Sequence, residues 1–349
     1  MPDTPADPPG LDLARLRAHL DRALPGTVQG PLRAELIEGG RSNLTYRLTD
    51  GTSRWVLRRP PLGHVLATAH DMGREHRVMT ALRDTGVPVP ATLLLDRGTD
   101  VLGAPWYLME HVPGTAHRDA AALGALGEQR VHALGHRLAD TLATLHRIDP
   151  AAVGLADFGR PEGYLERQLR RWSTQLEASR SRELPGVDRL HGLLAERLPA
   201  SPAPALVHGD YRLDNVLVDS SDRSGDTITA VLDWEMSTLG DPLTDVGLLV
   251  MYTELAGVGG GIIPSAATAP GFPAAGELVA RYAENTGRDA ADLHWYVAFA
   301  SFKLAVVAEG IHYRYRQGRT LGTGFERAGE MAPVLAEHGL TSLDALKER

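Results

Sequence analysis

The stretch LVHGDYRLDNVLVD, residues 206–219, places strongly polar side chains between two apolar ends. A turn between two strands would explain the glycine and one aspartate, because Gly, Asp and Asn initiate turns. It does not explain His208, Asp210 and Asn215 together, nor a second acidic site further along. That site is Asp233, to which the β-branched and apolar segment TITAVLDWE leads directly. The pattern therefore favours a short polar loop, followed by two strands, of which the second ends in a carboxylate.

Two charged residues upstream are predicted to face each other. A helix expected over about 70–84 places Glu75 in the same stripe as its apolar residues. A buried carboxylate is costly unless it is paired. Strand alternation in RWVLRRP puts Arg58 on the same face as Val56, which makes it the expected partner. The alternative is that Glu75 lies at the edge of the stripe and reaches water.

A glycine-rich turn precedes both residues. EGGRSNLTYRL places Gly39 and Gly40 between two strand patterns, where backbone amides can approach phosphate oxygens. Alone, such a pair is usually a simple hairpin. The order of the motifs along the chain is more informative than the glycine pair alone. It runs glycine-rich hairpin, strand cation, helix glutamate, connector, His-x-Asp-x4-Asn, strand, aspartate. This is the order of parts in kinases that transfer phosphoryl groups.

With these residues the sequence resembles the aminoglycoside phosphotransferase and choline kinase branch of the protein-kinase-like fold. HGDYRLDN is similar to the catalytic loop of that family, VLDWE to its metal-binding segment and GDPLTDVGLL to the helix that follows. GGRSNLTYRL, WVLRRPP, REHRVMTAL, YLMEHVPG and FASFKLAVVAEGIHYRYRQG resemble the branch that occurs alone in bacteria and fused to acyl-CoA dehydrogenases in animals. The resemblance covers roughly residues 27–335.

The resemblance implies a phosphotransferase that uses ATP and Mg²⁺. Asp210 would accept the proton of the acceptor hydroxyl or orient it, and Asn215 and Asp233 would bind the metal through hard oxygen atoms. Arg212 would neutralise the transferring phosphate, with a solvent-facing loop arginine as the alternative. His208 is expected to support the loop, and Asp245 to accept its backbone amides.

The resemblance also implies a nucleotide-binding set. Its members are Gly40, Arg41, Ser42 and Asn43 of the turn, Arg58, Glu75, and Glu110, His111 and Val112 of the connector, whose backbone would bind adenine. The family normally has Lys at the position of Arg58, and the two side chains are not interchangeable. A nucleotide-binding pseudokinase is therefore an alternative, although Asp210, Asn215 and Asp233 together argue against it.

The chain is predicted to form a bilobal α+β fold of the protein-kinase type. Short strand patterns and one helix occupy about residues 34–112: AELIE, NLTYRLT, RWVLR, ATLLLD and PWYLMEHV. Long helical patterns follow, the first over 126–148. We predict an N-terminal tail and leading helix over 1–26, a nucleotide-binding lobe with a small antiparallel sheet over 27–112, and a helical lobe with the acceptor site over 113–349.

Composition excludes several classes of protein. The chain has 349 residues, of which 43% are hydrophobic and 23% charged, as in ordinary globular proteins. Its net charge of −8 argues against nucleic acid and anionic membranes as partners. It has no cysteine, which excludes thiol catalysis. The acidic, proline-rich start lacks the features of a secretory signal, so we expect a cytoplasmic protein.

The acceptor is less well defined. Residues 160–182 hold six Arg against three Glu, and the last long helix ends HYRYRQGR. If these basic side chains line the acceptor side, the substrate is anionic. A hydroxy acid or hydroxyacyl-CoA then follows from the branch that the chain resembles, with an aminoglycoside or other small amino alcohol as the alternative. Residues 255–273, rich in Gly and Pro, are predicted to form a lid over this small-molecule acceptor. The sequence does not distinguish ATP from GTP, nor does it define the oligomeric state.

One histidine pair lies outside these motifs. His132 and His136 are four residues apart on the first long helix, which is half of a zinc site. Ala133 stands where a metalloprotease needs Glu. The sequence therefore favours a solvated helix face.

Overall fold

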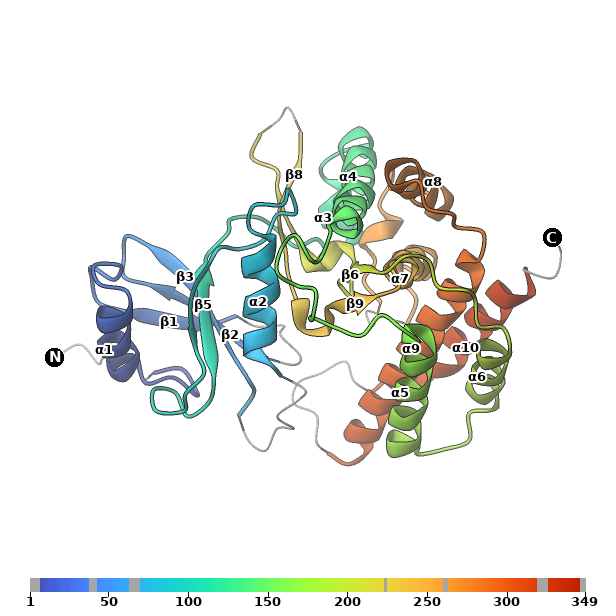
Figure 1. Ribbon diagram of the computed structural model, residues 1–349, viewed down its shortest axis with the longest axis horizontal. Helices are drawn as coiled ribbons and strands as arrows, with labels where there is room; N and C mark the ends of the chain where they lie inside the picture. Colours follow the sequence, from blue (N-terminus) through green and yellow to red (C-terminus); the bar gives the residue numbers. More distant parts are fainter. Residues whose placement is uncertain are drawn as a thin grey trace. The chain divides into compact units, whose positions relative to one another are not determined.

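The structure is a computed structural model that describes residues 7–37, 43–62, 70–222, 225–259, 263–318 and 326–345. The chain forms two compact units (Figure 1). The first comprises Met1–Pro113 together with Thr229–Glu235, and the second comprises Gly114–Ile228 and Met236–Arg349.

The first unit is built on an antiparallel sheet with the strand order β1-β2-β3-β5-β4. Its strands are β1 (Arg33–Leu36), β2 (Leu44–Thr49), β3 (Arg54–Arg59), β4 (Thr92–Asp96) and β5 (Trp106–Glu110). Each lies within one or two residues of a segment that the sequence marks as a strand. Runs of β-branched and aromatic residues, bounded by Gly, Pro and Asp, were sufficient to predict these strands from the sequence.

Helices cover the two faces of this sheet (Figure 1). α1 (Leu13–Ala23) packs one face, where fully buried Leu16 and Leu20 join Leu57 of β3 in the core. Burying two leucines contributes about 1.5–3 kcal/mol each. The next residue of β3, Arg58, points to the opposite face because side chains alternate along a strand. That face is covered by α2 (Met72–Leu82), which contacts β4 and β5.

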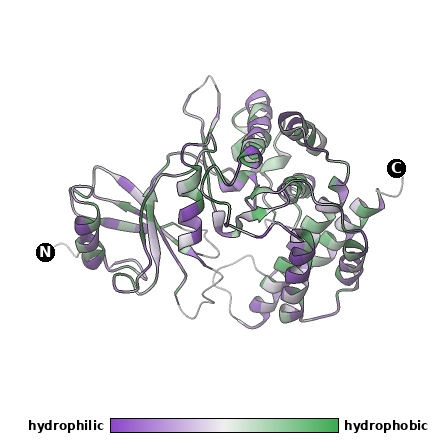
Figure 2. Ribbon diagram, viewed as in Figure 1, coloured by the Kyte–Doolittle hydropathy of each residue, from purple (hydrophilic) through white to green (hydrophobic). Residues whose placement is uncertain are grey.

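The second unit is mainly helical. Its longer helices are α4 (Glu128–Arg147), α5 (Tyr164–Ser179), α6 (Pro185–Glu196), α7 (Leu243–Glu254), α8 (Ala275–Thr286), α9 (Leu293–Arg316) and α10 (Ala328–Asp344). α7 and α9 pack at its centre. Gly247 allows this close approach, since a Cβ atom there would lie 2.6 Å from the backbone carbonyl carbon of Tyr296. Figure 2 shows mixed hydrophilic and hydrophobic residues along α1 and α5, as expected for helices with one packed face.

Short elements in the second unit carry the loop that the sequence marks as catalytic. β6 (Ala205–Val207) pairs with β9 (Thr238–Gly240) and leads into the loop. η1 (Leu213–Asn215) ends the loop, and β7 (Val216–Asp219) continues into a hairpin with β8 (Thr227–Val231). From Thr229 to Glu235 the chain belongs to the first unit, and η2 (Trp234–Met236) follows β8 there.

Several elements lie outside the sequence prediction, among them α3 (Ala120–Gly124), η3 (Ala266–Thr268), β9 and α10. α3 and η3 are too short for a periodic pattern. Pro333 lies inside α10, where a proline normally argues against a helix. Packing against α9 outweighs that local preference.

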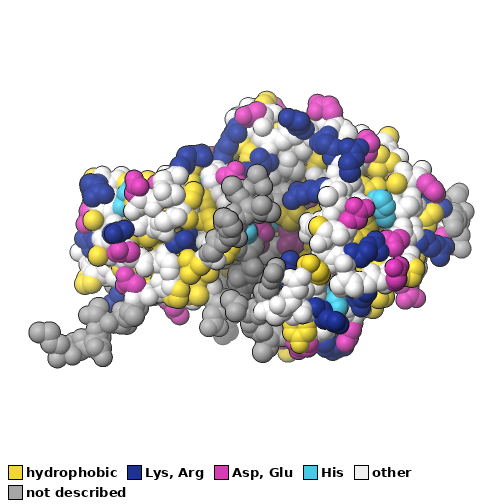
Figure 3. Space-filling model, turned by 90° about the horizontal axis from the view of Figure 1, so that it is seen from below, with side chains coloured by type: hydrophobic (Ala, Val, Ile, Leu, Met, Phe, Trp, Pro, Cys, Tyr) yellow, Lys and Arg dark blue, Asp and Glu magenta, His cyan; other side chains and the backbone are white. Residues whose placement is uncertain are grey.

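Among the described residues, no helix combines the length and the apolar character that crossing a bilayer requires. Basic and acidic side chains are interspersed on the face shown in Figure 3.

Candidate active site

Glu75 is paired within the first unit, as predicted. Its side chain is 1% exposed, and its Oε2 lies 3.4 Å from Nε of Arg58. Tyr107 of β5 donates a hydrogen bond to the same oxygen at 2.9 Å. Burial raises the pKa of Glu75, and Arg58 and Tyr107 oppose this shift. The predicted ion pair is confirmed, and the alternative of a water-exposed Glu75 is wrong.

The same guanidinium also contacts Asp233. Nη2 of Arg58 donates to Oδ1 of Asp233 at 3.1 Å, so Arg58 bridges two carboxylates. Among the described residues, Asp233 is the one non-glycine residue with a positive φ, +66°. A left-handed backbone costs about 1–2 kcal/mol for an L-residue, and such strain concentrates at functional sites. The backbone of Asp233 therefore gives independent support for a functional role.

The backbone of the loop after β6 is hydrogen-bonded to the side chain of Asp245 of α7. Oδ2 of Asp245 accepts the backbone N–H of His208 at 2.7 Å, and Oδ1 accepts that of Gly209 at 2.8 Å. Asp245 is fully buried, so these charge-assisted hydrogen bonds fix the loop strongly. Nδ1 of His208 in turn accepts the N–H of Asp210 at 3.2 Å. The predicted supporting roles of Asp245 and His208 are confirmed.

Asp210 and Asn215 contact each other across this loop. Nδ2 of Asn215 donates to the backbone carbonyl of Asp210 at 2.8 Å and to its Oδ2 at 3.0 Å. The amide nitrogen is thereby engaged on the loop, and Oδ1 is the atom that can serve a cation. An amide oxygen of this kind is a normal ligand of Mg²⁺, so the donor chemistry fits the predicted metal.

The carboxylate of Asp210 is ionised at neutral pH. Burial raises its pKa, but the nearby charges of Arg212 and Lys303 outweigh burial, and the pKa lies below its ordinary value. Lys303 of α9 donates to the backbone carbonyl of Gly209, which holds its ammonium group at the loop. An ionised carboxylate is the form that a general base requires.

Arg212 does not face solvent as a free side chain. Its Nε lies 3.4 Å from Oδ2 of Asp210 and 3.2 Å from Oδ1 of Asp214. Its guanidinium carbon lies 4.9 Å from the ring centroid of Tyr252, which indicates a cation–π contact. Asp214 lies in η1, and its 5% exposed side chain also pairs with Arg118. Its ion pairs are not visible in the sequence.

A pocket opens beside the loop within the second unit. It holds about 350 Å³ of empty volume, including the solvent at its mouth. Its lining is largely apolar, with Leu138 of α4, Leu249 of α7 and Phe272 of the segment after α7. Tyr252 also lines the pocket, and its hydroxyl donates to Oδ1 of Asp210 at 3.4 Å. The side chain of Tyr252 thus lies between the pocket and Asp210, the proposed base.

Sequence reasoning missed three side chains of this site: His117, Tyr252 and Lys303. His117 lines the pocket, is 6% exposed, and both of its ring nitrogens are buried without a hydrogen-bond partner in the described structure. No motif marks it. Lys303 did leave a signal, since it is a single cation within the apolar run FASFKLAVVA. A lone charge on a packed helix needs a partner. Here the ammonium group donates to the Gly209 carbonyl, and the charges of Asp210 and Asp245 favour its protonated form.

Only some of the predicted nucleotide-binding residues lie in the part of the chain that the structure describes. Gly40, Arg41 and Ser42 lie outside the described residues. Asn43 is 3% exposed, and its Nδ2 donates to Glu75 at 3.1 Å and to Glu235 at 3.2 Å. Asn43 thus binds two carboxylates of the first unit. β5 ends at Glu110, so His111 and Val112 lie beyond the strand ladder, where a ligand can use their backbone.

The fold and these residues define a phosphotransferase of the protein-kinase-like class. The chain belongs to the phosphotransferase enzyme family, which it matches over residues 33–294. It is thus an enzyme of the group that contains small-molecule kinases, as the sequence predicts.

Particular relatives can be named. The chain is 36% identical over 341 residues to acyl-CoA dehydrogenase family member 11 of Mus musculus, covering 95% of this chain and 43% of the relative. It thus spans less than half of that protein. A crystal structure of a candidate aminoglycoside phosphotransferase from Ralstonia eutropha has 32% identity and a TM-score of 0.80, covering 96% of this chain and 98% of the other.

A more distant structure shares the fold. Spectinomycin phosphotransferase, solved with ADP and spectinomycin, has 13% identity and a TM-score of 0.60, covering 95% of this chain and 99% of the other. The predicted family and fold are confirmed by these matches.

Proposed function

We propose that the protein transfers the γ-phosphate of ATP, with Mg²⁺, to a hydroxyl group of a hydroxy acid or a hydroxyacyl-CoA. One observation carries the proposal: an ionised carboxylate, Asp210, lies beside a largely apolar pocket in the second unit. A base next to a pocket of this character suits an alcohol carried on a hydrocarbon chain.

The proposed chemistry is a single in-line displacement. The acceptor hydroxyl attacks the γ-phosphorus, the bond to the oxygen that bridges the β- and γ-phosphates breaks, and ADP leaves. Asp210 accepts the hydroxyl proton. Arg212, held between Asp210 and Asp214, supplies positive charge near the transferring group. Such reactions depend mainly on positioning and charge neutralisation.

Asn215 and Asp233 would hold Mg²⁺ through an amide oxygen and a carboxylate. When bound, the metal neutralises charge on the phosphates. Arg58 would bind the phosphates in place of the usual lysine, and the connector would bind the adenine. An ADP complex of a relative with the same fold, spectinomycin phosphotransferase, supports use of a nucleotide.

The pocket favours an acyl acceptor over an aminoglycoside. A polycationic sugar requires several carboxylates that are available to it. Asp214 is an acidic residue of the lining, and it pairs with Arg212 and Arg118. The apolar lining and the neutral ring of His117, whose pKa burial lowers, instead suit a hydrocarbon chain with one polar group.

The basic side chains of residues 160–182 give less support than the sequence promised. Arg170 pairs with Glu166, Arg180 with Asp188, and Arg182 with Glu309. Three of the six arginines are therefore paired within the second unit. The case for a hydroxyacyl acceptor therefore rests on the pocket and on the relatives that carry an acyl-CoA dehydrogenase name.

A screen of acceptors tests this proposal. Purified protein, Mg²⁺ and ATP are incubated with hydroxyacyl-CoA thioesters that differ in the position of the hydroxyl, with the matching unsubstituted acyl-CoA, and with aminoglycosides and choline. ADP release and the phosphorylated product are measured. We expect turnover with a hydroxyacyl compound and none with its unsubstituted partner. Turnover of aminoglycosides alone would reverse the assignment, and no ATP consumption with any acceptor would favour the pseudokinase.

A further inference from the structure

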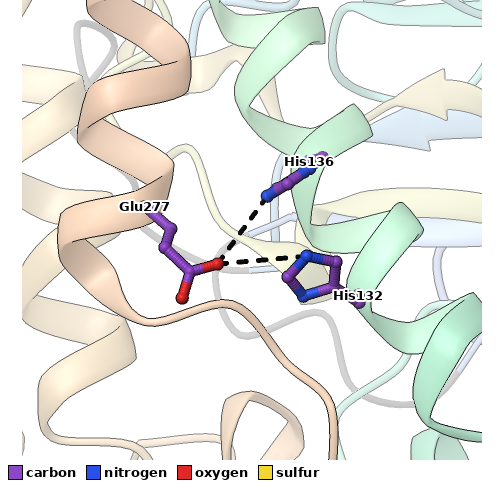
Figure 4. A group of neighbouring side chains, drawn as sticks. All are labelled: His132, His136 and Glu277. Carbon is purple, nitrogen blue, oxygen red and sulfur yellow. Dashed lines mark ion pairs between the residues drawn. The ribbon is translucent and has the colours of Figure 1, made fainter.

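His132 and His136 of α4 and Glu277 of α8 form a cluster of metal-ligating groups in the second unit (Figure 4). One donor atom from each side chain lies within 4.8 Å of the other two. In the part of the chain that the structure describes, no other His, Asp and Glu side chains gather in this way. The cluster belongs to neither the proposed base nor its pocket.

The two histidines share one helix face. Residues four apart on a helix are neighbours, and the ring centroids of His132 and His136 are 4.4 Å apart. Their Nε2 atoms lie 3.9 Å and 4.0 Å from the same oxygen of Glu277. These separations exceed direct hydrogen bonds. The three groups therefore lie close together without direct hydrogen bonds between Glu277 and the histidines, and the dashed lines in Figure 4 mark the two ion pairs.

The register of the two helices is fixed one turn further along. Asp140 of α4, four residues after His136, accepts two hydrogen bonds from Arg281 of α8, at 2.7 and 2.9 Å. Arg281 is itself four residues after Glu277. The same two helix faces thus present first the His–His–Glu group and then a bidentate ion pair. The ion pair between Asp140 and Arg281 keeps Glu277 opposite the histidines.

A second contact prepares His132 as a ligand. Its Nδ1 lies 3.2 Å from the backbone carbonyl of Gly271. A carbonyl oxygen only accepts, so Nδ1 must carry the proton. In the neutral ring Nε2 is then the basic nitrogen, and it is the atom that faces Glu277. A carbonyl that orients a metal-binding histidine in this way is the usual outer-sphere arrangement.

We propose that His132, His136 and Glu277 bind a zinc-like divalent transition metal, with water in the remaining position. Two imidazoles and one carboxylate suit Zn²⁺, whereas Mg²⁺ prefers oxygen ligands. Tetrahedral zinc at 2.0–2.2 Å requires donor separations of about 3.4 Å. The donors must close by roughly 0.5–1.4 Å, which rotamer changes of these partly exposed side chains can supply. The metal would fasten α4 to α8.

Calorimetric titration of the metal-free full chain with ZnCl₂ tests this site. We expect one equivalent to bind, and Tm to rise to a plateau as zinc is added. His132→Gln combined with His136→Gln should abolish binding, and Glu277→Gln should weaken it at least tenfold. His294→Gln, a partly buried histidine on α9, is the matched control and should bind zinc as wild type does.

A spectroscopic readout separates a true site from loose association. Co²⁺ bound in place of zinc should show the absorption of a tetrahedral complex in wild type and in His294→Gln. The double histidine variant should lack it. Zinc binding that persists in the double variant, or wild type that binds no zinc, would overturn the proposal. Circular dichroism of each variant shows whether it is folded.

Discussion

Nη2 of Arg58 donates a hydrogen bond to Oδ1 of Asp233, at 3.1 Å, while Nε of the same side chain pairs with buried Glu75. One guanidinium thus links the strand, the helix and the proposed metal ligand of the first unit. The lysine usual in this family could serve the phosphates, but its single ammonium could not span both carboxylates in this forked way.

Loss of Arg58 should destabilise the protein through Glu75. Arg58→Met leaves a buried carboxylate without its cation, and we expect the free energy of unfolding to fall by about 3–5 kcal/mol. Urea unfolding measures this change. Adding Glu75→Gln to Arg58→Met should restore much of the stability but none of the phosphotransfer. A single variant as stable as wild type would show that the pair is not structurally important.

Because Asp233 has a left-handed backbone, two variants that both lack its carboxylate should be equally inactive but differ in stability. Asp233→Ala and Asp233→Gly both remove the carboxylate, so both should abolish phosphotransfer. They differ only in the Cβ atom, and we expect the glycine variant to be more stable by about 1–2 kcal/mol. Equal unfolding free energies for the two variants would mean that the φ of +66° carries no strain.

His117 should affect the acceptor and not the nucleotide. Its ring nitrogens are buried without partners, so replacing it by Leu should leave Tm unchanged or raised. The KM for the acceptor should rise about tenfold, the effect of losing one hydrogen bond of about 1.4 kcal/mol. The KM for ATP is the internal control. Unchanged acceptor KM would remove His117 from the acceptor site.

Lys303 should set the acid limit of activity. Its charge lowers the pKa of Asp210, so Lys303→Met should raise that pKa and reduce the ionised fraction at low pH. The acid limb of the kcat/KM profile should therefore move to higher pH in this variant. In wild type it should lie below about pH 4, the ordinary range of an aspartate. Lys303→Arg keeps the charge and should keep the wild-type limb. A profile that does not move in Lys303→Met would contradict the assigned pKa.

The fold was largely predictable because its elements carry local signals. The five strands of the sheet and helices α2 and α4 follow from alternation, helical spacing and Gly or Pro at the ends. α10 was not predictable, since Pro333 argues against a helix and tertiary packing decides the outcome.

The site was predictable where motif and pairing rules apply. Asp245 and the Glu75–Arg58 pair follow from resemblance and from the cost of an unpaired buried charge. His117 and Glu277 were not predictable. Each gains its neighbours from segments far away in the chain, and a single sequence shows no such contact. The nucleotide and metal roles of individual residues, and the cytoplasmic location, stay predictions.

Replacement of Asp210 by Asn tests the central claim most directly. Asn keeps the shape of the side chain and loses the base. With a hydroxyacyl acceptor and Mg-ATP, we predict that kcat falls about 10²–10⁴-fold while ATP binding and Tm stay near wild type. Near wild-type turnover by Asp210→Asn would contradict the account.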